Sequence, residues 1–356
     1  MLLSERNAMT WIKTLNKRVR AEDSLSSARR KAALMISFII IATALFFYLL
    51  HPYRSHTQLL NIAYDAPRIY FQQVDTSCAM DVKTSHAGSI LQTESLTKGL
   101  VADTVCLSSA EEIELLNSDK HIVAPDWREH FPYHCSPFYT TAVMLVKKAK
   151  ENSIRNWDDL FSKDVLVALP SPAISGLGRH AYLTLLANRL STSPREAQKE
   201  VTKLMLKAHL YGLGAYQSFY CFLNDCKADV FITWENEAIR IVEREPQTYE
   251  IIYPSMGIIA EPTVAILHKY TQKRETTEQA RAYLNYLFSK EGQIIAETNG
   301  LRPRIPNRIR NFPEIELKSI TEIFGNLKET YQQHFAPNGT FQQILKLREA
   351  HIGGVE

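Results

Sequence analysis

The feature that most constrains the fold of this chain is an apolar run over residues 32–50, AALMISFIIIATALFFYLL, which contains no charged side chain. As a helix, a run of this length spans roughly 28 Å, enough to cross the hydrocarbon core of a membrane. Eight Lys and Arg residues stand in positions 1–31 against three acidic residues. Such a basic flank marks the cytoplasmic side. We therefore expect a basic cytoplasmic segment over 1–31, a transmembrane segment over 32–50 and an exported part after residue 51.

Two interpretations of residues 32–50 stay open, an uncleaved signal-anchor and a removable signal peptide. Ala42, Thr43 and Ala44 provide the small residues that a cleavage site needs. The apolar run continues for six residues beyond Ala44, and the segment before the run is long. We favour the uncleaved anchor for these two reasons.

The net charge differs between residues 1–31 and the rest of the chain. The whole chain of 356 residues carries +3, but after residue 31 there are 33 Lys and Arg against 35 Asp and Glu. The positive charge therefore concerns membrane orientation, and it gives no support to a nucleic-acid partner. The five cysteines stand at 78, 106, 135, 221 and 226, without the spacing of a zinc site, and their pairing stays open.

Short β-branched runs alternate with amphipathic stretches in the exported part. The predicted strands cover 59–63, 82–84, 104–107, 143–146, 165–169, 230–233, 251–253 and 264–267. The predicted helices cover 90–100, 111–116, 181–190, 195–207 and 277–288. This alternation predicts an α/β fold with mostly parallel sheets, followed from about residue 306 by a helical tail with loops.

Four of the predicted strands run into a small or helix-capping residue and then into a helix. The junctions are YDAP at 64–67, SHAGS at 85–89, SGLGR at 175–179 and WENEA at 234–238. Ligands of open α/β sheets bind beyond the carboxyl ends of the strands, and the free N–H groups of helix starts favour anions. The junctions therefore predict an oxyanion site made of neutral donors.

No motif of a catalytic site is present. The sequence has no Gly-x-Ser-x-Gly, HExxH or P-loop pattern and no set of nucleophile, base and acid at a motif spacing. We therefore expect a protein that is not an enzyme and that uses no cofactor and no metal.

Eleven segments, spread over nearly all of residues 57–345, carry a family resemblance. They are LLNIAYDAPR (59–68), SHAGS (85–89), GLVADTVCL (99–107), SPFYTTAVMLVKK (136–148), NWDDL (156–160), SGLGR (175–179), ADVFITWENEA (228–238), PSMGIIAEPTVAI (254–266), YLFSKEGQ (286–293), LRPR (301–304) and HFAPNGTF (334–341). Through them the chain resembles the sulfate- and thiosulfate-binding proteins of bacterial ABC importers.

The resemblance implies a type II periplasmic-binding-protein fold, in which two α/β lobes joined by crossover strands close on the ligand. Lobe I would cover 57–137 and return over 265–356 with the C-terminal helices, and lobe II would cover 138–264. The protein would capture sulfate or thiosulfate between the lobes and deliver it to the permease subunits of an ABC importer. We expect a monomer in the periplasm, anchored to the inner membrane by residues 32–50.

The resemblance also implies a cage of seven neutral donors. Lobe I would supply the backbone N–H groups of Asp65 and Ser89. Lobe II would supply the Ser175 hydroxyl, the N–H groups of Gly176, Leu177 and Ala215, and the indole N–H of Trp234. Donors alone suit a fully ionised anion, because a buried acceptor facing it is repulsive. A carboxylate aimed at the anion, for which Asp65 is the candidate, would favour phosphate instead.

Three positions depart from the family pattern. Leu177 stands where the family has a second glycine, Ala87 also replaces a glycine, and Tyr216 stands where the family usually has arginine. These departures leave two alternatives open: another oxyanion, such as molybdate, phosphate or an organic sulfonate, or a membrane-tethered sensor subunit on the same fold. Outside the cage, two interpretations of Arg179 stay open, support of the site through helix-end or carbonyl contacts and a solvated helix face. Glu235 and Glu237 are expected to be structural, in an interlobe or importer-docking contact, and His86 and His180 to lie at the surface or beside the site.

Overall fold

The computed structural model describes residues 17, 57–118, 121–148, 153–162, 164–191, 193–225 and 227–352. The predicted membrane segment at 32–50, and residues 1–31 apart from Lys17, lie outside this part of the chain. Within it, no helix has the length and apolar character that a membrane crossing requires. Residues 58–356 form one compact unit, in which everything below is located.

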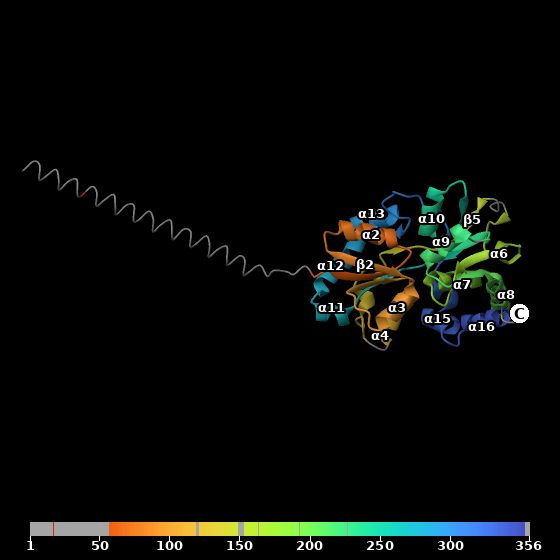
Figure 1. The fold of residues 1–356 in the computed structure, drawn as a ribbon, viewed down its shortest axis with the longest axis horizontal. Helices are drawn as coiled ribbons and strands as arrows, with labels where there is room; N and C mark the ends of the chain where they lie inside the picture. The colour runs from red at the N-terminus through yellow and green to blue at the C-terminus, as the bar shows by residue number, and fades with distance from the viewer. Residues whose placement is uncertain are drawn as a thin grey trace, which may run out of the picture. The chain divides into compact units, whose positions relative to one another are not determined.

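Two sheets organise this unit (Figure 1). The first has the strand order β11-β3-β1-β2 and is built from β1 (Leu59–Tyr64), β2 (Val82–Ala87), β3 (Thr104–Leu107) and β11 (Thr263–Ile266). The second has the order β7-β6-β8-β5-β9 and is built from β5 (Ala142–Lys147), β6 (Val167–Pro170), β7 (His209–Tyr211), β8 (Val230–Trp234) and β9 (Tyr249–Ile252). We call the first sheet with its helices lobe I and the second sheet with its helices lobe II.

Helices cover both sheets. Those that follow strands of the first sheet are α2 (Arg68–Ser77), α3 (Ser89–Thr97), α4 (Ala110–Ser118), α11 (His268–Arg274), α12 (Thr277–Phe288) and α13 (Lys290–Thr298). Those that follow strands of the second are α6 (Asp159–Ser162), α7 (Gly176–Arg189), α8 (Pro194–Lys207), α9 (Ala215–Asp225) and α10 (Glu235–Arg244). The remaining elements are the 3-10 turn η1 (Trp127–Glu129), the short α5 (Pro132–Cys135), and the C-terminal α14 (Ile320–Phe324), α15 (Leu327–Phe335) and α16 (Thr340–Ile352).

The central strands are buried on both faces, which explains their continuous apolar sequences. All five residues of β8, VFITW, and all four of β3, TVCL, are buried. The predicted α/β fold with two lobes is confirmed, and the two sheets contain four parallel and three antiparallel strand pairs, so the parallel majority is small. Strand β11 is antiparallel to β3, and β5 is antiparallel to both β8 and β9. Strands β5 and β11 directly follow a crossing between the lobes, and β9 ends just before one.

Three crossings connect the lobes. The chain leaves lobe I through β4 (Phe138–Tyr139) and returns after β10 (Met256–Ile258), and the two passages pair through Thr140 and Ala260 with N···O distances of 3.0 and 2.8 Å. A third passage begins at β12 (Arg302–Pro303), which is antiparallel to β4, and continues to β13 (Glu316–Lys318), which is parallel to β10. Paired passages of this kind form a hinge between two rigid bodies.

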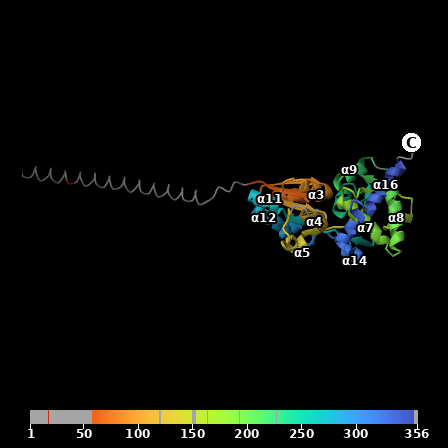
Figure 2. The same cartoon turned by 90° about the horizontal axis from the view of Figure 1, so that it is seen from below.

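The C-terminal helices contact both lobes: α16 packs on α8 of lobe II, and α15 contacts α4 of lobe I as well as Tyr182 of lobe II. The prediction assigned all of 265–356 to lobe I, but α16 contacts α8 and lies beside it in two views (Figures 1 and 2). The Arg348 guanidinium donates to the carbonyl of Ala208 at 2.9 Å, and the Tyr182 hydroxyl lies 3.2 Å from His334 Nδ1. We therefore propose lobe boundaries in which β11 to α13 return to lobe I and the last helices belong to lobe II.

The cysteines that the structure describes, Cys78, Cys106, Cys135 and Cys221, carry free thiols. Cys226 lies outside the described residues. Cys106 is fully buried in β3, and burial raises the pKa of its thiol far above the ordinary value. No cross-link holds the described part of the fold together, so its stability comes from packing.

Candidate functional site

Three helices of the two lobes begin at one point of the boundary. A side-chain carbon placed on Gly88, directly before α3 of lobe I, would lie 3.4 Å from the Cα of Gly214, directly before α9, and 3.2 Å from the carbonyl of Ile174, shortly before α7. The first N–H groups of a helix have no carbonyl partner within that helix, and they carry the positive end of its dipole. The boundary therefore gathers three donor-rich helix ends, of which those of α3 and α7 belong to the four sequence junctions and that of α9 does not.

Helix α7 begins with a capped turn. The Ser175 hydroxyl accepts the N–H of Gly178 at 3.4 Å, so its own hydrogen stays available to donate. Gly176 and Leu177 follow as the first two helical residues, and the Leu177 side chain is buried in the apolar core. The isobutyl group therefore points away from the helix end, and the substitution of glycine by leucine leaves the backbone donor in place.

Gly176 touches the opposite lobe. A side-chain carbon at this position would collide with the hydroxyl of Ser108 and would lie 2.8 Å from its Cβ. Only a glycine allows this approach, because 2.8 Å is shorter than carbon atoms tolerate. The two lobes therefore meet in a closed arrangement at the start of α7.

Trp234, the last residue of β8, carries a donor without an acceptor. Its side chain is 1% exposed, and its indole Nε1 has no hydrogen-bond partner among the residues that the structure describes. The ring lies 5.0 Å from the ring of His180, whose Nε2 donates to the carbonyl of Ile258 at 3.0 Å and which is neutral because burial lowers its pKa to about 4. A buried N–H without a partner costs about 1–3 kcal/mol, which a bound acceptor recovers.

Asp65 joins the lobes through its side chain. Its carboxylate accepts the N–H of Tyr216, the second residue of α9, at 2.9 Å, and burial raises its pKa although this N–H and the nearby Arg68 oppose the shift. The Tyr216 ring lies 4.6 Å from the Arg68 guanidinium and 5.7 Å from that of Arg240. Where the family has an arginine, the tyrosine thus contacts two arginines from opposite lobes.

A second buried carboxylate, Glu112 on α4, was missed from the sequence, where 111–116 was assigned only to an amphipathic helix. Glu112 is fully buried and accepts hydrogen bonds from the Ser89 hydroxyl and from the Ser108 hydroxyl, the latter at 3.0 and 3.1 Å. The backbone N–H of Ser108 donates to Ser89 Oγ at 2.9 Å. The surroundings of Glu112 are visible only in the folded structure, because the parallel pairing of β2 and β3 with β1 brings Ser89 and Ser108 together.

The other side chains singled out from the sequence have partners within the protein. Glu235 forms a buried two-point ion pair with Arg302 of the third passage, at 2.7 and 2.9 Å. Glu237 pairs with Arg240 at 2.8 Å, and the Arg179 Nε donates to the Pro172 carbonyl at 3.1 Å. His86 is partly buried beside the Tyr64 carbonyl, and burial lowers its pKa to about 4.

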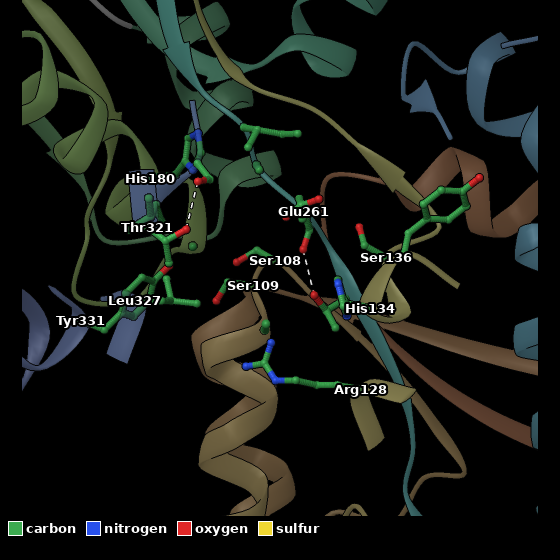
Figure 3. A pocket seen from close by; sticks show the side chains of 18 of the residues that line it. Ser108, Ser109, Arg128, His134, Ser136, His180, Glu261, Thr321, Leu327 and Tyr331 are labelled. Carbon is green, nitrogen blue, oxygen red and sulfur yellow. Dashed lines mark hydrogen bonds between the residues drawn. The ribbon is translucent and has the colours of Figure 1, made fainter. Parts of the chain in front are cut away.

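A cavity of about 220 Å³ adjoins the helix ends (Figure 3). Gly176 and Trp234 line it, together with side chains such as Ser108, Arg128 and His134 of the first half of the chain and Tyr331 of α15. Of the seven predicted donors, Asp65, Ser89, Ser175, Leu177 and Ala215 do not line this cavity. Among the described residues, no group of His, Cys, Asp and Glu has the arrangement of a metal site.

Comparison with known proteins agrees with the two-lobed fold. A family profile described as "Bacterial extracellular solute-binding protein" matches residues 69–302. The chain is 32% identical over 303 residues to the thiosulfate-binding protein of Pseudomonas aeruginosa, covering 80% of this chain and 91% of that one. It is 35% identical over 307 residues to the sulfate-binding protein of Escherichia coli, covering 81% and 93%. The structure of the sulfate-binding protein SubI from Mycobacterium tuberculosis superposes with a TM-score of 0.69 at 24% identity, covering 77% and 99%.

Proposed function

The chain belongs to the bacterial extracellular solute-binding proteins, and on this premise we propose that it captures sulfate or thiosulfate and delivers the anion to an ABC importer. Relatives named for both anions match across most of their length, which supports the ligand class. The protein acts by binding and not by catalysis. It works outside the cytoplasm, and residues 32–50 tether it to the inner membrane.

The observation that carries the proposal is the unpartnered indole N–H of Trp234. A buried donor that lines a cavity together with Gly176, the first residue of α7, is explained by an anion that accepts from it. The proposed cage consists of this N–H, the Ser175 hydroxyl and the backbone N–H groups of Asp65, Ser89, Gly176, Leu177 and Ala215. All seven groups donate, so the charge of the anion is balanced by dipoles and not by an arginine or lysine.

Lobe closure couples anion binding to recognition by the permease. Asp65 and Ser89 belong to lobe I, and the other five groups belong to lobe II, so the complete cage exists only when the lobes meet. An anion therefore shifts the equilibrium toward the closed form, and the closed form is the one that docks on the permease.

Replacing Trp234 by phenylalanine tests the proposal. A hydrogen bond to a charged group contributes about 1.5–3 kcal/mol, so Trp234→Phe lowers the affinity for sulfate by about tenfold to a hundredfold in titration calorimetry. The matched control is Trp157→Phe, because Trp157 is equally buried in lobe II but its Nε1 already donates to the Met256 carbonyl at 2.9 Å. The proposal fails if neither sulfate nor thiosulfate binds the wild-type protein, or if both variants lose affinity equally.

A second candidate is another oxyanion on the same cage. The buried carboxylate of Glu112 beside Ser89 favours it, because a carboxylate can accept the proton of hydrogen phosphate. Competition of phosphate, molybdate and an organic sulfonate against bound sulfate separates the two candidates: displacement at concentrations below that of sulfate supports the second.

A further inference from the structure

The strongest unexplained feature of the boundary is that Glu112, a fully buried carboxylate of lobe I, binds two serine hydroxyls of lobe I and lies close to Gly176 of lobe II. Its hydroxyl partner Ser89 is the first residue of α3, whose backbone N–H is a proposed donor. Its other hydroxyl partner, Ser108, lies against Gly176, and a side-chain carbon at Gly176 would lie 3.4 Å from Glu112 Oε1. Two proposed donors therefore lie next to one carboxyl group.

The groups that face Glu112 leave its charge poorly balanced. Arg179 of α7 is the cation that acts on it, and the Ser89 and Ser108 hydroxyls and the N–H of Ser109 also favour the ionised form. Glu111 on the same helix, Tyr64 of β1, Cys106 of β3 and Tyr331 of α15 are the other titratable groups whose charges interact with it. Burial outweighs the favourable contacts and raises the pKa of Glu112.

An ionised Glu112 opposes an anion in the cage. Sulfate and thiosulfate carry two charges at neutral pH and have no proton to share, so a neighbouring carboxylate raises the free energy of the complex. A neutral carboxyl group removes this repulsion. It also donates its hydrogen to a serine oxygen, which frees the Ser108 hydroxyl hydrogen to turn toward Gly176 and the anion.

We propose that Glu112 takes up one proton from solvent when the cage closes on a dianion, so that this residue makes sulfate binding dependent on pH and weakens it at pH values where the carboxylate stays ionised. The proton adds to a carboxylate oxygen, and no other bond changes. This inference rests on the proposed function, since it concerns the same cage.

Calorimetric titration of the full-length chain with sodium sulfate between pH 5 and 9 tests the inference. Once the pH exceeds the pKa of Glu112 in the free protein, the affinity falls by up to tenfold per pH unit, because the complex binds one more proton than the free protein. Titrations at pH 8 in buffers of different ionisation enthalpy then report uptake of about one proton per sulfate. Sulfate itself does not titrate in this range, so the proton belongs to the protein.

Glu112→Gln removes the effect, and two matched variants assign it. The glutamine variant binds sulfate with the same affinity at every pH and about tenfold more tightly than wild type at pH 8. Glu111→Gln, one residue along α4, and Glu237→Gln, at another buried carboxylate with a raised pKa, keep the wild-type pH dependence. A pH dependence that disappears in Glu237→Gln and persists in Glu112→Gln overturns the inference.

Two further measurements keep the test decisive if the glutamine variant does not fold. In the wild-type protein, sulfate binding without proton uptake and without pH dependence overturns the inference and leaves the proposed function standing. Ser108→Ala removes one hydroxyl donor to the carboxylate, so it raises the pKa of Glu112 and moves the onset of the affinity loss to higher pH. Absence of sulfate binding at every pH refutes the proposed function instead.

Discussion

At the scale of single residues, the boundary between the lobes is notable for buried carboxylates whose charge is only partly compensated. Glu237 lies in the first turn of α10 and is 3% exposed, with Arg240 as its ion-pair partner at 2.8 Å. Burial raises its pKa to about 7, and the charge of Asp65 adds to the shift, while Arg240 and Arg68 oppose it. The desolvation of this carboxylate therefore exceeds the benefit of its ion pair.

The raised pKa of Glu237 predicts that the protein loses stability as the pH rises. The folded state holds a proton on Glu237 up to about pH 7, whereas an unfolded chain releases it near its ordinary value of 4.5. The contribution of Glu237 to the free energy of unfolding is therefore complete below pH 4.5 and is lost as the pH rises through 7. The total loss is about 3 kcal/mol. Urea unfolding at pH 5 and pH 8 measures this loss.

Glu237→Gln flattens this pH dependence, because glutamine does not titrate. Glu245→Gln is the control, since Glu245 is exposed just after the same helix and should keep the wild-type slope. Equal slopes in the wild-type protein and in Glu237→Gln would show that another group titrates.

At the scale of elements, one capping device recurs with different consequences. Ser175, Ser193 and Ser289 each accept an N–H in the first turn of α7, α8 and α13, at 3.4, 3.3 and 3.2 Å. Ser175 is buried at the lobe boundary, whereas Ser193 is exposed. The same hydroxyl therefore serves helix stability in one case and faces the proposed ligand in the other.

Paired alanine substitutions separate the two roles. Ser175→Ala and Ser193→Ala each remove one cap and lower the free energy of unfolding by about 1 kcal/mol. Ser175→Ala alone lowers the affinity for sulfate, by about tenfold, because it also removes a donor to the anion. Thermal unfolding and calorimetric titration of both variants provide the comparison. An equal affinity in Ser175→Ala and the wild-type protein would remove Ser175 from the cage.

The elements that sequence reasoning predicted are those whose pattern is local. The runs at 104–107 and 230–233 coincide with the buried strands β3 and β8, and SGLGR with the capped start of α7. Glu112 could not be found in this way, because its partners Ser89 and Ser108 meet it only after the sheet has formed. The spacing of apolar residues in α4 predicts which face of the helix is buried. It does not predict that the carboxylate of Glu112 on that face lies beside two hydroxyl groups.

At the scale of the whole unit, the cage is an interface between two bodies. The lobes contact each other through Asp65 and Tyr216, through Gly176 and Ser108, and through Asn236, whose side-chain amide donates to the Ala66 carbonyl at 3.2 Å. The crossings at β4 and β12, which pair with each other, connect the two lobes and supply the proposed hinge. The order of lobes was predictable from the resemblance, but the packing of α15 and α16 on lobe II was not, because it depends on side chains such as Arg348 and His334.

The close approach at Gly176 predicts a variant that cannot close. Gly176→Ala places a carbon where Ser108 already lies, so the lobes stay apart, sulfate affinity falls by about a hundredfold, and sulfate no longer reduces the radius of gyration in solution scattering. The double variant with Ser108→Gly removes the collision and restores much of both effects. If Gly176→Ala closes on sulfate like the wild-type protein, the closed contact described here is not required for binding.

The free thiols differ in burial, so their reaction rates can report how the fold opens. Cys106 and Cys135 are sealed from water, while Cys78 and Cys221 are half-buried. A thiol reagent reaches the first two only when a lobe comes apart, and it reaches the other two during smaller fluctuations. Labelling rates measured by mass spectrometry therefore distinguish small local fluctuations, reported by Cys78 and Cys221, from the opening of a lobe, reported by Cys106 and Cys135. No reporter group needs to be added to the chain.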